Sequence, residues 1–517
     1  MVAGTQTPRA AGTPWRSGLS KSRLAIFEQC AKRLWLSVNK PDAAQESNGT
    51  KLAFRIGHDV GDIACTLLPD GIMIDGANGM TFAAEATCKA LLANERRPLF
   101  EATFIHEGVV VRVDLLIPDG AGWHVVEVKS TTRVKPYHCA DLATQLWVMR
   151  GCGVPVTKAS IRVIDTSFVL TEAGNYHGLF TDEQAGDEVA EILASRADVV
   201  AAANATLDGP EPALSVGAHC SDPFQCSFET YCRRDLPQSP TWPVSLLPGV
   251  GGKALARTMI SEGVDDLLLV DAERTAHPLL ERVRAATFSG DAYHDAEGVR
   301  RDTDCWSYPR TFLDFETIAP AIPRWLGTSP YQQVPFQFSA HIDRGDGELE
   351  HRKFLSIDGD DPRHACAEAL ATLPTAGAVV AWNASFERTC LLKLAAVSPL
   401  YESVLRSLAD RLVDLLPVAR RHYYHRDMRG SWSIKAVLPT LAPELDYGSL
   451  TGAQSGVEAQ ESYLEAIDGK TSLDRRQEIR RGLLDYCRLD TLAMVIALER
   501  LQGPASQVLP SQGLPDR

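Results

Sequence analysis

Alternation of apolar and polar residues divides the first half of the chain into strands framed by helices. An amphipathic pattern with helical spacing over residues 51–68 predicts a helix. Three alternating stretches, 99–106, 109–117 and 123–129, predict strands because short turn signals separate them. Residues 139–151 predict another helix. This order indicates an α/β domain with acidic residues inside otherwise apolar strands.

A second alternating pattern begins after residue 306. The segment TFLDFETI predicts a strand, and FQFSAHID and HRKFLSID predict a strand pair around the turn Arg344–Gly347. Residues 363–373 predict a helix, and AVVAWN predicts the next strand. The remainder is mostly helical and ends in a strongly periodic helix over 474–501. The chain is therefore expected to contain a second α/β domain.

Shifts in composition mark the domain boundaries. A Pro-rich stretch, DLPQSPTWPVSLLPG, separates the two patterned regions. Both ends of the chain are rich in loop-forming residues, which is typical of mobile termini. We expect five segments: a disordered arm at 1–19, an α/β domain at 20–235, a small helical linker at 236–305, a second α/β domain at 306–502 and a mobile tail at 503–517.

The composition of the 517 residues is that of a globular protein, with 45% hydrophobic and 23% charged residues. No apolar stretch is long enough to span a membrane, and the first 20 residues lack the apolar core of a secretory signal. We therefore expect a cytoplasmic protein without membrane contact. The 12 cysteines are scattered, so disulfides are not expected in that reducing compartment, and a clustered subset indicates a metal.

The net charge of −14 argues against wholesale binding of a polyanion. It does not exclude a nuclease, because carboxylates that bind a metal add acidic residues whose charge the bound cation offsets. Local patterns of acids therefore carry more information than the total charge.

The first candidate site consists of two carboxylates and a lysine. Asp114 lies inside an apolar strand, and Glu127 and Lys129 share one face of the next strand. Carboxylate oxygens suit Mg²⁺, which lowers the pKa of a bound water and polarises a phosphate, while a lysine stabilises developing negative charge. The pattern predicts metal-assisted phosphodiester hydrolysis. The alternative is that both acids are solvated strand positions.

Flanking residues extend this pattern. His58 on the preceding helix can supply a nitrogen ligand, Glu101 begins a strand, and Gln145 lies on the following helix. Together they resemble the RecB/AddB branch of the PD-(D/E)xK nucleases over residues 20–235. The resemblance implies a restriction-endonuclease-like domain in which His58, the strand aspartate and the E-x-K motif form the metal site and Gln145 completes it. The sequence departs from the family at Met149, where a tyrosine is often found.

Four cysteines form a further candidate site. Cys220, Cys226 and Cys232 follow C-x5-C-x5-C spacing, and Cys30 lies far earlier in the chain. Four thiolates suit a [4Fe–4S] cluster or zinc, and the spacing leaves both open. One distant cysteine with a closing trio resembles the iron–sulfur clasp of AddB-type nucleases. That resemblance implies a [4Fe–4S] cluster that ties the first helix to the end of the domain. The alternative is four independent buried thiols.

A second set of acidic residues lies in the C-terminal half. Asp314 and Glu316 share one face of a strand. Glu387 follows the strand AVVAW, and Tyr486 and Asp490 share one face of the last helix. Four carboxylates from two strand ends and a helix can converge on two Mg²⁺ or Mn²⁺ ions, as two-metal phosphoryl transfer requires. In that arrangement Tyr486 would orient the attacking water.

These three motifs resemble the DnaQ-like 3′–5′ exonucleases of the DEDD type, which implies a ribonuclease-H-like α/β domain. Asn383 opens the middle motif and is expected to contact nucleic acid. That motif normally ends in aspartate, so Glu387 is a departure, and Asp414 is the alternative third acid. The complete order also resembles a bacterial group of RecB-like nucleases with a C-terminal ribonuclease-H-like domain, over nearly the whole chain.

Two segments are candidates for binding nucleic acid. The stretch ARRHYYHRDMRGSWSIK can follow phosphates and stack on unpaired bases, although an ordinary basic helix surface has the same composition. The segment LPGVG resembles a helix–hairpin–helix that offers backbone amides to a DNA phosphate, with a packing or spacer turn as the alternative. The expected contacts are Arg420, Arg421, Tyr423, Tyr424, Arg426 and Trp432 in the first segment, and Gly249 and Gly251 in the second.

The sequence as a whole predicts a metal-dependent nuclease with two active sites that degrades or trims DNA ends or single strands. One alternative has a single active site, with the other serving as a binding surface. Another is a non-catalytic iron–sulfur scaffold that holds nucleic acid or a partner nuclease. The intact Lys129 and Tyr486 favour an enzyme. A protein partner such as a helicase is compatible with each, and the choice between DNA and RNA stays open.

Overall fold

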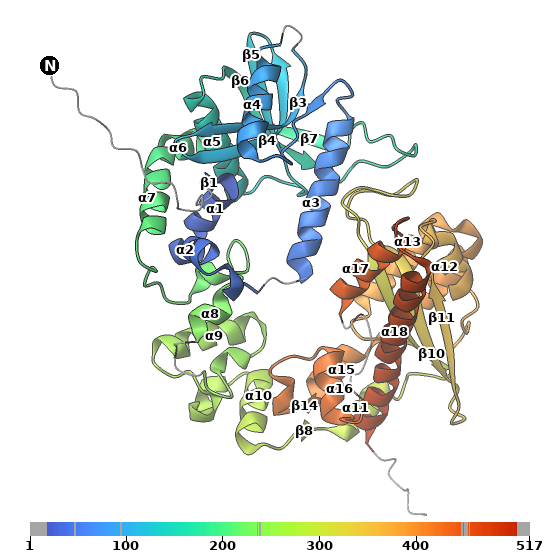
Figure 1. Cartoon of the computed structure of the whole chain (residues 1–517). Coiled ribbons are helices and arrows are strands. Elements are labelled where there is room, and N and C mark those ends of the chain that lie inside the picture. The colour runs from blue at the N-terminus through green and yellow to red at the C-terminus, as the bar shows by residue number, and fades with distance from the viewer. Residues whose placement is uncertain are drawn as a thin grey trace, which may run out of the picture. The chain divides into compact units, whose positions relative to one another are not determined.

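The computed structural model describes residues 18–503 except 46–47, 94–95, 235, 237–238, 446–447, 449–452 and 454. Nearly all of the expected arm at 1–19 and tail at 503–517 therefore lies outside the described residues. The described chain is mixed α/β and forms two compact units (Figure 1). Unit 1 comprises Met1–Leu236 and Pro320–Tyr331, and unit 2 comprises Pro237–Ala319 and Gln332–Arg517. Within the described residues, no helix combines the length and apolar character of a membrane span.

Unit 1 is built on a seven-stranded mixed sheet. Its order is β2-β3-β4-β5-β6-β7, and β1 pairs with β4 outside this path. The three strands expected between residues 99 and 129 are present as the antiparallel run β3, β4 and β5. The strands are β1 Leu19–Ser20, β2 Ile72–Met73, β3 Leu99–His106, β4 Val109–Asp119, β5 Gly122–Val128, β6 Val156–Ile164 and β7 Phe180–Gln184.

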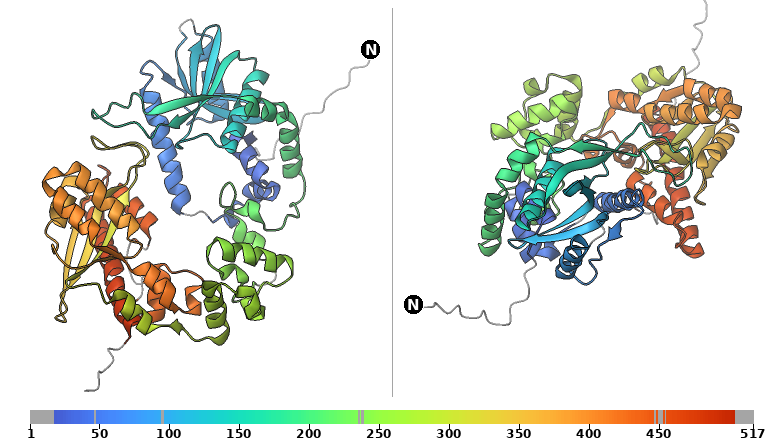
Figure 2. Two further views of the ribbon diagram at one scale, coloured as in Figure 1. Left: turned by 180° about the vertical axis from the view of Figure 1, so that it is seen from behind. Right: turned by 90° about the horizontal axis from the view of Figure 1, so that it is seen from above.

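Alternation along these strands gives the sheet two apolar faces. On one face, Leu116 and Val125 share a core with residues of α1, α5 and α7. On the other, Leu115 and Val126 pack with Ala64 of α3. Figure 1 and Figure 2 accordingly show α3 and α7 on opposite sides of the sheet. The helices are α1 Lys21–Gln29, α2 Ala31–Asn39, α3 Asn48–Thr66, α4 Met80–Leu91, α5 Pro136–Gly151, α6 Asp187–Ala194, α7 Arg196–Asp208 and α8 Glu229–Arg233.

Unit 2 contains a five-stranded sheet with the order β11-β10-β9-β12-β13. β10 is antiparallel to both β11 and β9, and β12 runs parallel to both β9 and β13. The strand pair expected around Arg344–Gly347 is thus present as β10 and β11. The strands are β9 Arg310–Ile318, β10 Val334–Asp343, β11 Leu349–Leu355, β12 Val379–Ala381 and β13 Leu412–Asp414, and a separate pair is formed by β8 Tyr293–His294 and β14 Tyr423–Tyr424.

Helices cover both faces of the unit 2 sheet. Leu313 and Phe315 of β9 pack with residues of α12, α13 and α14. The opposite face meets α18, where the Gln337 side chain donates to the Leu483 carbonyl at 2.7 Å. Asp314 therefore lies on the α18 side of the sheet. The helices are α12 Pro362–Leu370, α13 Ser385–Val397, α14 Glu402–Asp410, α15 Leu415–His422, α16 Ile434–Leu441, α17 Gly456–Ala466 and α18 Leu473–Gln502.

The segment expected as a separate linker shares a hydrophobic core with unit 2. Its main helices are α9 Gly249–Ser261, α10 Pro278–Ser289 and α11 Ala296–Thr303. Met259 of α9 and Val283 of α10 are fully buried in one cluster with Phe312 of β9 and Met494 of α18. These helices therefore help to hold β9, which carries the acidic residues of the second candidate site.

Candidate metal centres

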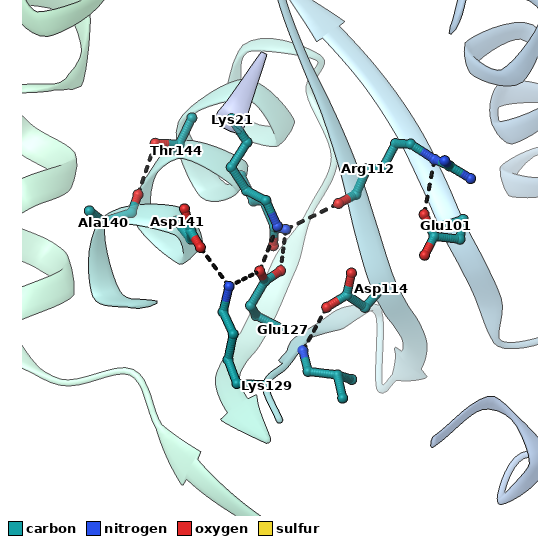
Figure 3. Close-up of polar contacts among 11 residues, drawn as sticks. Lys21, Glu101, Arg112, Asp114, Glu127, Lys129, Ala140, Asp141 and Thr144 are labelled. Atoms are coloured by element: carbon teal, nitrogen blue, oxygen red, sulfur yellow. Dashed lines mark hydrogen bonds and ion pairs between the residues drawn. The ribbon is translucent and has the colours of Figure 1, made fainter. Parts of the chain in front are cut away.

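In unit 1, two carboxylates meet across neighbouring strands. β4 and β5 are antiparallel with Leu115 opposite Val126, a register that makes Asp114 and Glu127 neighbours. Asp114 Oδ2 accepts a hydrogen bond of 2.7 Å from the backbone N–H of Val128, and Glu127 is only 1% exposed. Figure 3 shows the two acids side by side on these strands.

Two lysines contact Glu127 from different elements. Lys129 lies one residue beyond the end of β5, and its Nζ is 2.8 Å from Glu127 Oε1. Lys21 is the first residue of α1, and its Nζ is 2.5 Å from the same oxygen. Both ammonium groups point at this carboxylate in Figure 3. A divalent cation bound by Glu127 would therefore compete with both lysines for its oxygens.

Helix α5 supplies two further groups to this site. Asp141 and Gln145 are four residues apart and so share one face of the helix. Asp141 Oδ2 lies 2.5 Å from Lys129 Nζ. The Gln145 side chain donates to Glu127 Oε2 at 2.5 Å and to the Arg112 carbonyl at 3.1 Å. Lys129 is thus held between two carboxylates, and Glu127 accepts hydrogen bonds from three side chains.

Burial and neighbouring charges separate the pKa values of the two acids. Burial, followed by the charge of Glu127, raises the pKa of Asp114 to about 7. Burial also disfavours ionised Glu127, but Lys129 and Lys21 outweigh it and hold the pKa of Glu127 below its usual value. Near neutral pH, Glu127 is therefore ionised while Asp114 titrates, so a cation that binds Asp114 displaces a proton.

The other residues singled out around the expected PD-(D/E)xK pattern, His58, Glu101 and Met149, lie in three different environments. His58 is exposed on α3, and in the described part of the chain it does not form a close ligand group with Asp114 and Glu127. Glu101 pairs with the Arg112 side chain at 2.9 Å. Met149 is fully buried in the core of unit 1, so the position where the family often has tyrosine serves packing here.

The four cysteines expected to form a clasp come together in unit 1. Cys30 ends α1 and caps α2, where its sulfur accepts the Arg33 N–H at 3.4 Å. Cys220, Cys226 and Cys232 lie in the segment that closes the unit and ends in α8. All four thiols line one small cavity. The structure therefore brings cysteines from two segments that are distant in sequence to the same cavity.

A polar network holds the same two segments together beside the cysteines. Glu211 accepts a hydrogen bond from the Tyr231 hydroxyl at 2.9 Å and pairs with Lys32 and Lys40 at 3.2 and 3.0 Å. The Gln29 side chain donates to two carbonyls of the closing segment, at 2.8 and 2.6 Å. Hydrogen bonds and ion pairs therefore hold this junction together.

In unit 2, three carboxylates lie close enough to share metal ions. β9 presents Asp314 and Glu316 toward α18, which carries Asp490. One oxygen of each lies within 4.8 Å of the others, and among the described residues no other group of three potential ligands meets this distance. Glu316 and Asp490 are 8% and 7% exposed. Alternation on β9 and the packing of α18 thus produce the acidic group that the motifs predict.

Glu387 is a further buried acid whose charge acts on Asp314, although it lies outside the close group of three. It lies in the first turn of α13, is 3% exposed, and its Oε2 has no hydrogen-bond partner in the described structure. Burial raises the pKa of Asp314 well above its usual value, and the charges of Asp490, Glu316 and Glu387 add to this effect, which places Glu387 near the other acids. A buried carboxylate oxygen without a partner is costly unless a proton or a cation compensates it.

Asp414, the alternative third acid, has a local structural role. Its Oδ1 accepts the backbone N–H groups of Leu416 and Asn383, each at 3.0 Å. Asp414 therefore caps α15 and also holds Asn383, whose φ of +75° lies in the left-handed region. Both bonds go to Oδ1 of Asp414, which is half-buried, whereas Glu387 is almost fully buried and its Oε2 has no partner among the described residues. Glu387 is therefore the acid that more strongly requires a proton or a cation.

Tyr486 is linked to a lysine. Lys435 of α16 donates from Nζ to the Tyr486 hydroxyl oxygen at 2.9 Å, and its ammonium lies 4.5 Å from the centre of the ring. Because an ammonium group can only donate, the tyrosine proton is directed elsewhere, and the Tyr486 side chain also hydrogen-bonds Asp490. Cys487 lies beside the centre, with Sγ 3.8 Å from Asp314 Oδ2.

The unit 2 centre holds its acids together with little positive charge. Burial raises the pKa of Glu316 to about 8, with Asp490 contributing and Lys435 opposing. Burial raises the pKa of Glu387 to about 8, with a further contribution from Asp414. The metal-free centre therefore retains protons at neutral pH, and cations that bind there must displace them.

Three aromatic residues of the basic stretch lie in the core, which corrects the expectation that they stack on bases. Tyr423, Tyr424 and Trp432 are 3%, 0% and 4% exposed and belong to the main core cluster of unit 2. Trp432 Nε1 donates to the Tyr423 carbonyl at 2.9 Å. Rings buried in this way cannot meet an unpaired base, so their role is packing.

The basic residues of the same stretch stay closer to the surface. Arg420 and Arg421 are exposed, and Arg421 pairs with Asp302 at 2.9 Å. Arg426 is half-buried, with its guanidinium 5.3 Å from the ring centre of Trp242. Exposed cations of this kind suit phosphate contacts, and their binding of nucleic acid stays a prediction.

The glycines of the LPGVG segment lie at the start of a helix. α9 begins at Gly249, which has a φ of +72°, and Gly249 and Gly251 are both exposed. The element before them is a three-residue 3-10 turn, Val244–Leu246, rather than the α-helix of a complete helix–hairpin–helix. The exposed amides remain compatible with the predicted phosphate contact.

A known protein family matches part of the sequence of unit 2. The family described as "Domain of unknown function (DUF2779)" matches residues 311–433. This range includes Asp314, Glu316 and Glu387 but ends before Tyr486 and Asp490. No curated protein sequence matches the chain. The match covers a minor part of the chain and assigns no function to it.

Three charged residues at these centres were missed by the sequence analysis. Lys21 is separated from Glu127 by 106 positions, and Lys435 from Tyr486 by 51. Neither distance corresponds to a local pattern. Asp141 could have been found, because it precedes Gln145 by four residues on the same helix.

We predict that Mn²⁺ stabilises the protein more at pH 9 than at pH 6. In the folded, metal-free protein the pKa values of Glu316 and Glu387 are raised to about 8, whereas in the unfolded chain a glutamate has a pKa of about 4.3. The contribution of these two acids to stability is therefore fully present only below about pH 4.3. This contribution is lost as the pH rises through about 8. Above that pH the two acids are ionised, so Mn²⁺ does not have to displace their protons. Thermal unfolding in EDTA and in Mn²⁺ from pH 6 to 9 measures the difference. Equal stabilisation across this range would contradict the prediction.

We predict opposite effects for the two alternative acids. Glu387→Gln keeps the side-chain shape but removes the charge, so it should weaken Mn²⁺ binding by unit 2. Asp414→Ala should retain binding and lower the free energy of unfolding by about 0.5–2 kcal/mol, because a helix cap is lost. Calorimetric titration with Mn²⁺ and denaturant unfolding measure the two effects. Loss of binding in Asp414→Ala with normal binding in Glu387→Gln would make Asp414 the ligand.

Proposed function

We propose that the protein is a Mg²⁺- or Mn²⁺-dependent nuclease with two phosphodiesterase sites, one in each unit, that degrades or trims DNA ends or single strands. The observation that carries the proposal is the buried group of Asp314, Glu316 and Asp490, with Glu387 beside it. Buried carboxylates with so little compensating charge are stable only when protons or cations compensate them, and divalent cations would supply that charge. An all-oxygen ligand set suits hard divalent cations of this kind.

The topology of the two units supports the same proposal. In unit 2, β9 carries two of the acids at the centre of the sheet, between antiparallel β10 and parallel β12. This is the arrangement expected for a ribonuclease-H-like, DnaQ-like exonuclease. In unit 1, Glu127 of β5 lies beside Asp114 of β4, and Lys129 follows just beyond the end of β5, as expected for a PD-(D/E)xK nuclease.

In unit 2, bound cations would activate a water and neutralise the scissile phosphate. The chain itself supplies the orientation. Lys435 occupies a lone pair of the Tyr486 oxygen, so the tyrosine proton faces Asp490 and the space around the acids. Lys435 also places a positive charge next to the carboxylates, where negative charge develops during cleavage. This geometry supports 3′–5′ exonuclease chemistry, in which Tyr486 positions the attacking water.

In unit 1, the residues available for chemistry are held by mutual contacts. Gln145 fixes Glu127, and Asp141 fixes Lys129. Lys129 and Lys21 therefore keep two positive charges beside a candidate metal ligand, where they can stabilise the charge of a cleaving phosphate. The pKa of Asp114, raised to about 7, lets this residue exchange a proton for a cation near neutral pH.

The cysteine group of unit 1 fits a [4Fe–4S] cluster better than zinc. Sulfur atoms at about 2.3 Å from one zinc ion would lie about 3.8 Å apart. Among the described residues, the four cysteine sulfurs include no group of three within 4.8 Å of one another. They nevertheless line one cavity. A cluster bound there would tie α1 and α2 to the closing segment.

We predict that single substitutions separate the two activities. Asp314→Asn should lower the unit 2 rate by about 10²–10³-fold, since metal binding contributes several kcal/mol to phosphoryl transfer. Lys129→Ala should remove the unit 1 activity and leave that of unit 2. The assay is cleavage of end-labelled single strands with Mg²⁺ or Mn²⁺, and the double variant is the matched inactive control.

The pattern of products assigns each activity, because release of single nucleotides from the 3′ end is expected only when Asp314 is intact. No cleavage by the unmodified protein, on DNA or RNA and with either metal, would contradict the proposal. Retained binding of single strands in that case would favour the non-catalytic scaffold.

We predict about four iron atoms per chain in protein purified without oxygen. Cys226→Ser should lose the iron and loosen the closing segment, whereas the sheet of unit 1 stays folded because the Glu211 network persists. Cys139→Ser, at a buried thiol outside the group, is the matched control and should keep the iron. Metal analysis and circular dichroism measure both. Stoichiometric zinc without iron would contradict the cluster, and a metal-free folded protein would contradict the clasp.

A further inference from the structure

The connection between β9 and β10 forms a closed loop that belongs to unit 1. Both strands are in unit 2, but residues Pro320–Tyr331 are part of unit 1 by their contacts. The backbone N–H of Tyr331 donates to the Pro320 carbonyl at 2.8 Å, so the two ends of the loop meet. A compact loop of 12 residues whose ends are close is an Ω-loop, a type that is frequently functional.

The Ω-loop is held in unit 1 by backbone hydrogen bonds and by apolar contacts. The N–H of Leu170 donates to the Thr328 carbonyl at 3.0 Å, and the N–H of Gly327 donates to the Leu170 carbonyl at 2.7 Å. The Tyr176 hydroxyl donates to the Pro323 carbonyl at 3.1 Å. Unit 1 thus contacts the backbone of the Ω-loop both through its own backbone and through a side chain, which indicates that the loop has a specific position in unit 1.

The apolar part of the fit involves a helix, a strand and a loop residue. Ala321 is 4% exposed and packs in a buried cluster with Val60 of α3, Ile164 of β6 and Leu179. The loop therefore completes a core of unit 1 that lies next to the strands of the first candidate site.

The last residue of the loop contacts the residue that follows Lys129. The Tyr331 hydroxyl donates to the Ser130 carbonyl. Lys129 lies just beyond β5, and two backbone hydrogen bonds join the chain at and after it to β6. The N–H of Lys129 donates to the Arg162 carbonyl at 2.8 Å, and the N–H of Ile164 donates to the Thr131 carbonyl at 2.9 Å. The hydrogen bond from Tyr331 holds Ser130, the residue between these two bonds.

The backbone of Tyr331 is itself in an unfavourable conformation. Its φ is +58°, in the left-handed region that a bulky residue rarely adopts. Such a conformation costs free energy and persists only where the surroundings enforce it, which occurs most often at functional positions. Here the enforced conformation directs the ring toward Ser130.

We propose that the Ω-loop Pro320–Tyr331 is part of the first nuclease site, with Tyr331 as a positioning residue that fixes the chain after Lys129. The inference rests on the proposed nuclease function of unit 1. The segment that follows β9, the strand that carries Asp314 and Glu316 of the unit 2 site, then completes the unit 1 site. The unit 1 activity then requires residues that are encoded within the second half of the chain.

The test uses the full-length chain with Asp314→Asn, so that only the unit 1 activity is measured. Tyr331→Phe keeps the ring and removes the hydroxyl, and we expect kcat to fall about tenfold with KM unchanged, as for the loss of one hydrogen bond. Tyr176→Phe is the matched control, because it removes a hydroxyl bond to the same loop away from Lys129. A fall no larger in Tyr331→Phe than in Tyr176→Phe would overturn the positioning role.

A second variant replaces residues 321–331 by two glycines, which the close ends of the loop permit. In an Asp314-containing chain with Lys129→Ala, the unit 2 activity should be retained, because the register of β9 and β10 does not involve the loop. In the Asp314→Asn chain, the unit 1 activity should be lost. Retention of the unit 1 activity would overturn the inference.

Hydrogen exchange separates this inference from the proposed function. In Tyr331→Phe we expect faster exchange of amides at residues 129–135, and in Tyr176→Phe we expect unchanged exchange there. This measurement requires no nuclease activity. Faster exchange without any cleavage by the unmodified protein would contradict the proposed function alone, whereas unchanged exchange in Tyr331→Phe would overturn the anchoring by Tyr331.

Discussion

The burial of neighbouring carboxylates is the constraint on which both candidate centres depend. A carboxylate removed from water is stable only when a donor, a cation or a proton compensates it. Unit 1 meets this demand with its own side chains, since Glu127 accepts hydrogen bonds from Lys21, Lys129 and Gln145. Unit 2 instead keeps its acids together with raised pKa values, and within the described part of the chain an oxygen of Glu387 has no hydrogen-bond partner. One centre is therefore largely self-compensated, whereas the other depends on protons or added cations.

Local patterns in the sequence were sufficient to predict the elements that carry these acids. Alternation with a period of two defines β3 to β5 and β9 to β11, and it also places Asp314 and Glu316 on one face. Helical spacing likewise places Tyr486 and Asp490 together. Lys21 and Lys435 could not be predicted, because their positions follow from how α1 and α16 pack against distant elements. Such tertiary packing has no signature in a short stretch of sequence.

The amphipathic character of Tyr and Trp explains why the base-stacking role predicted for Tyr423, Tyr424 and Trp432 was wrong. Tyr and Trp combine a large apolar ring with a polar group, so the same residue serves a core and a base-stacking surface. Tyr424 and Trp432 proved to be core residues because α9, α10 and the sheet of unit 2 cover them. The expected linker failed as a separate segment for a related reason. Its apolar positions, such as Met259, find their partners in β9 and α18, which lie much later in the chain.

The division of the chain also affects the order in which the protein can fold during synthesis. Unit 1 is interrupted after Leu236 and resumes at Pro320. At a synthesis rate of about 5–20 residues per second, its last segment follows the earlier part by roughly 5–20 s. Until then Ile164 and Leu179 lack the cover of Ala321, so newly made unit 1 exposes apolar surface of the kind that chaperones bind. Unit 1 is complete at Tyr331, before unit 2, whose helix α18 ends at Gln502, but the first segment of unit 2 is made before unit 1 is finished. The maturation of the two units therefore overlaps.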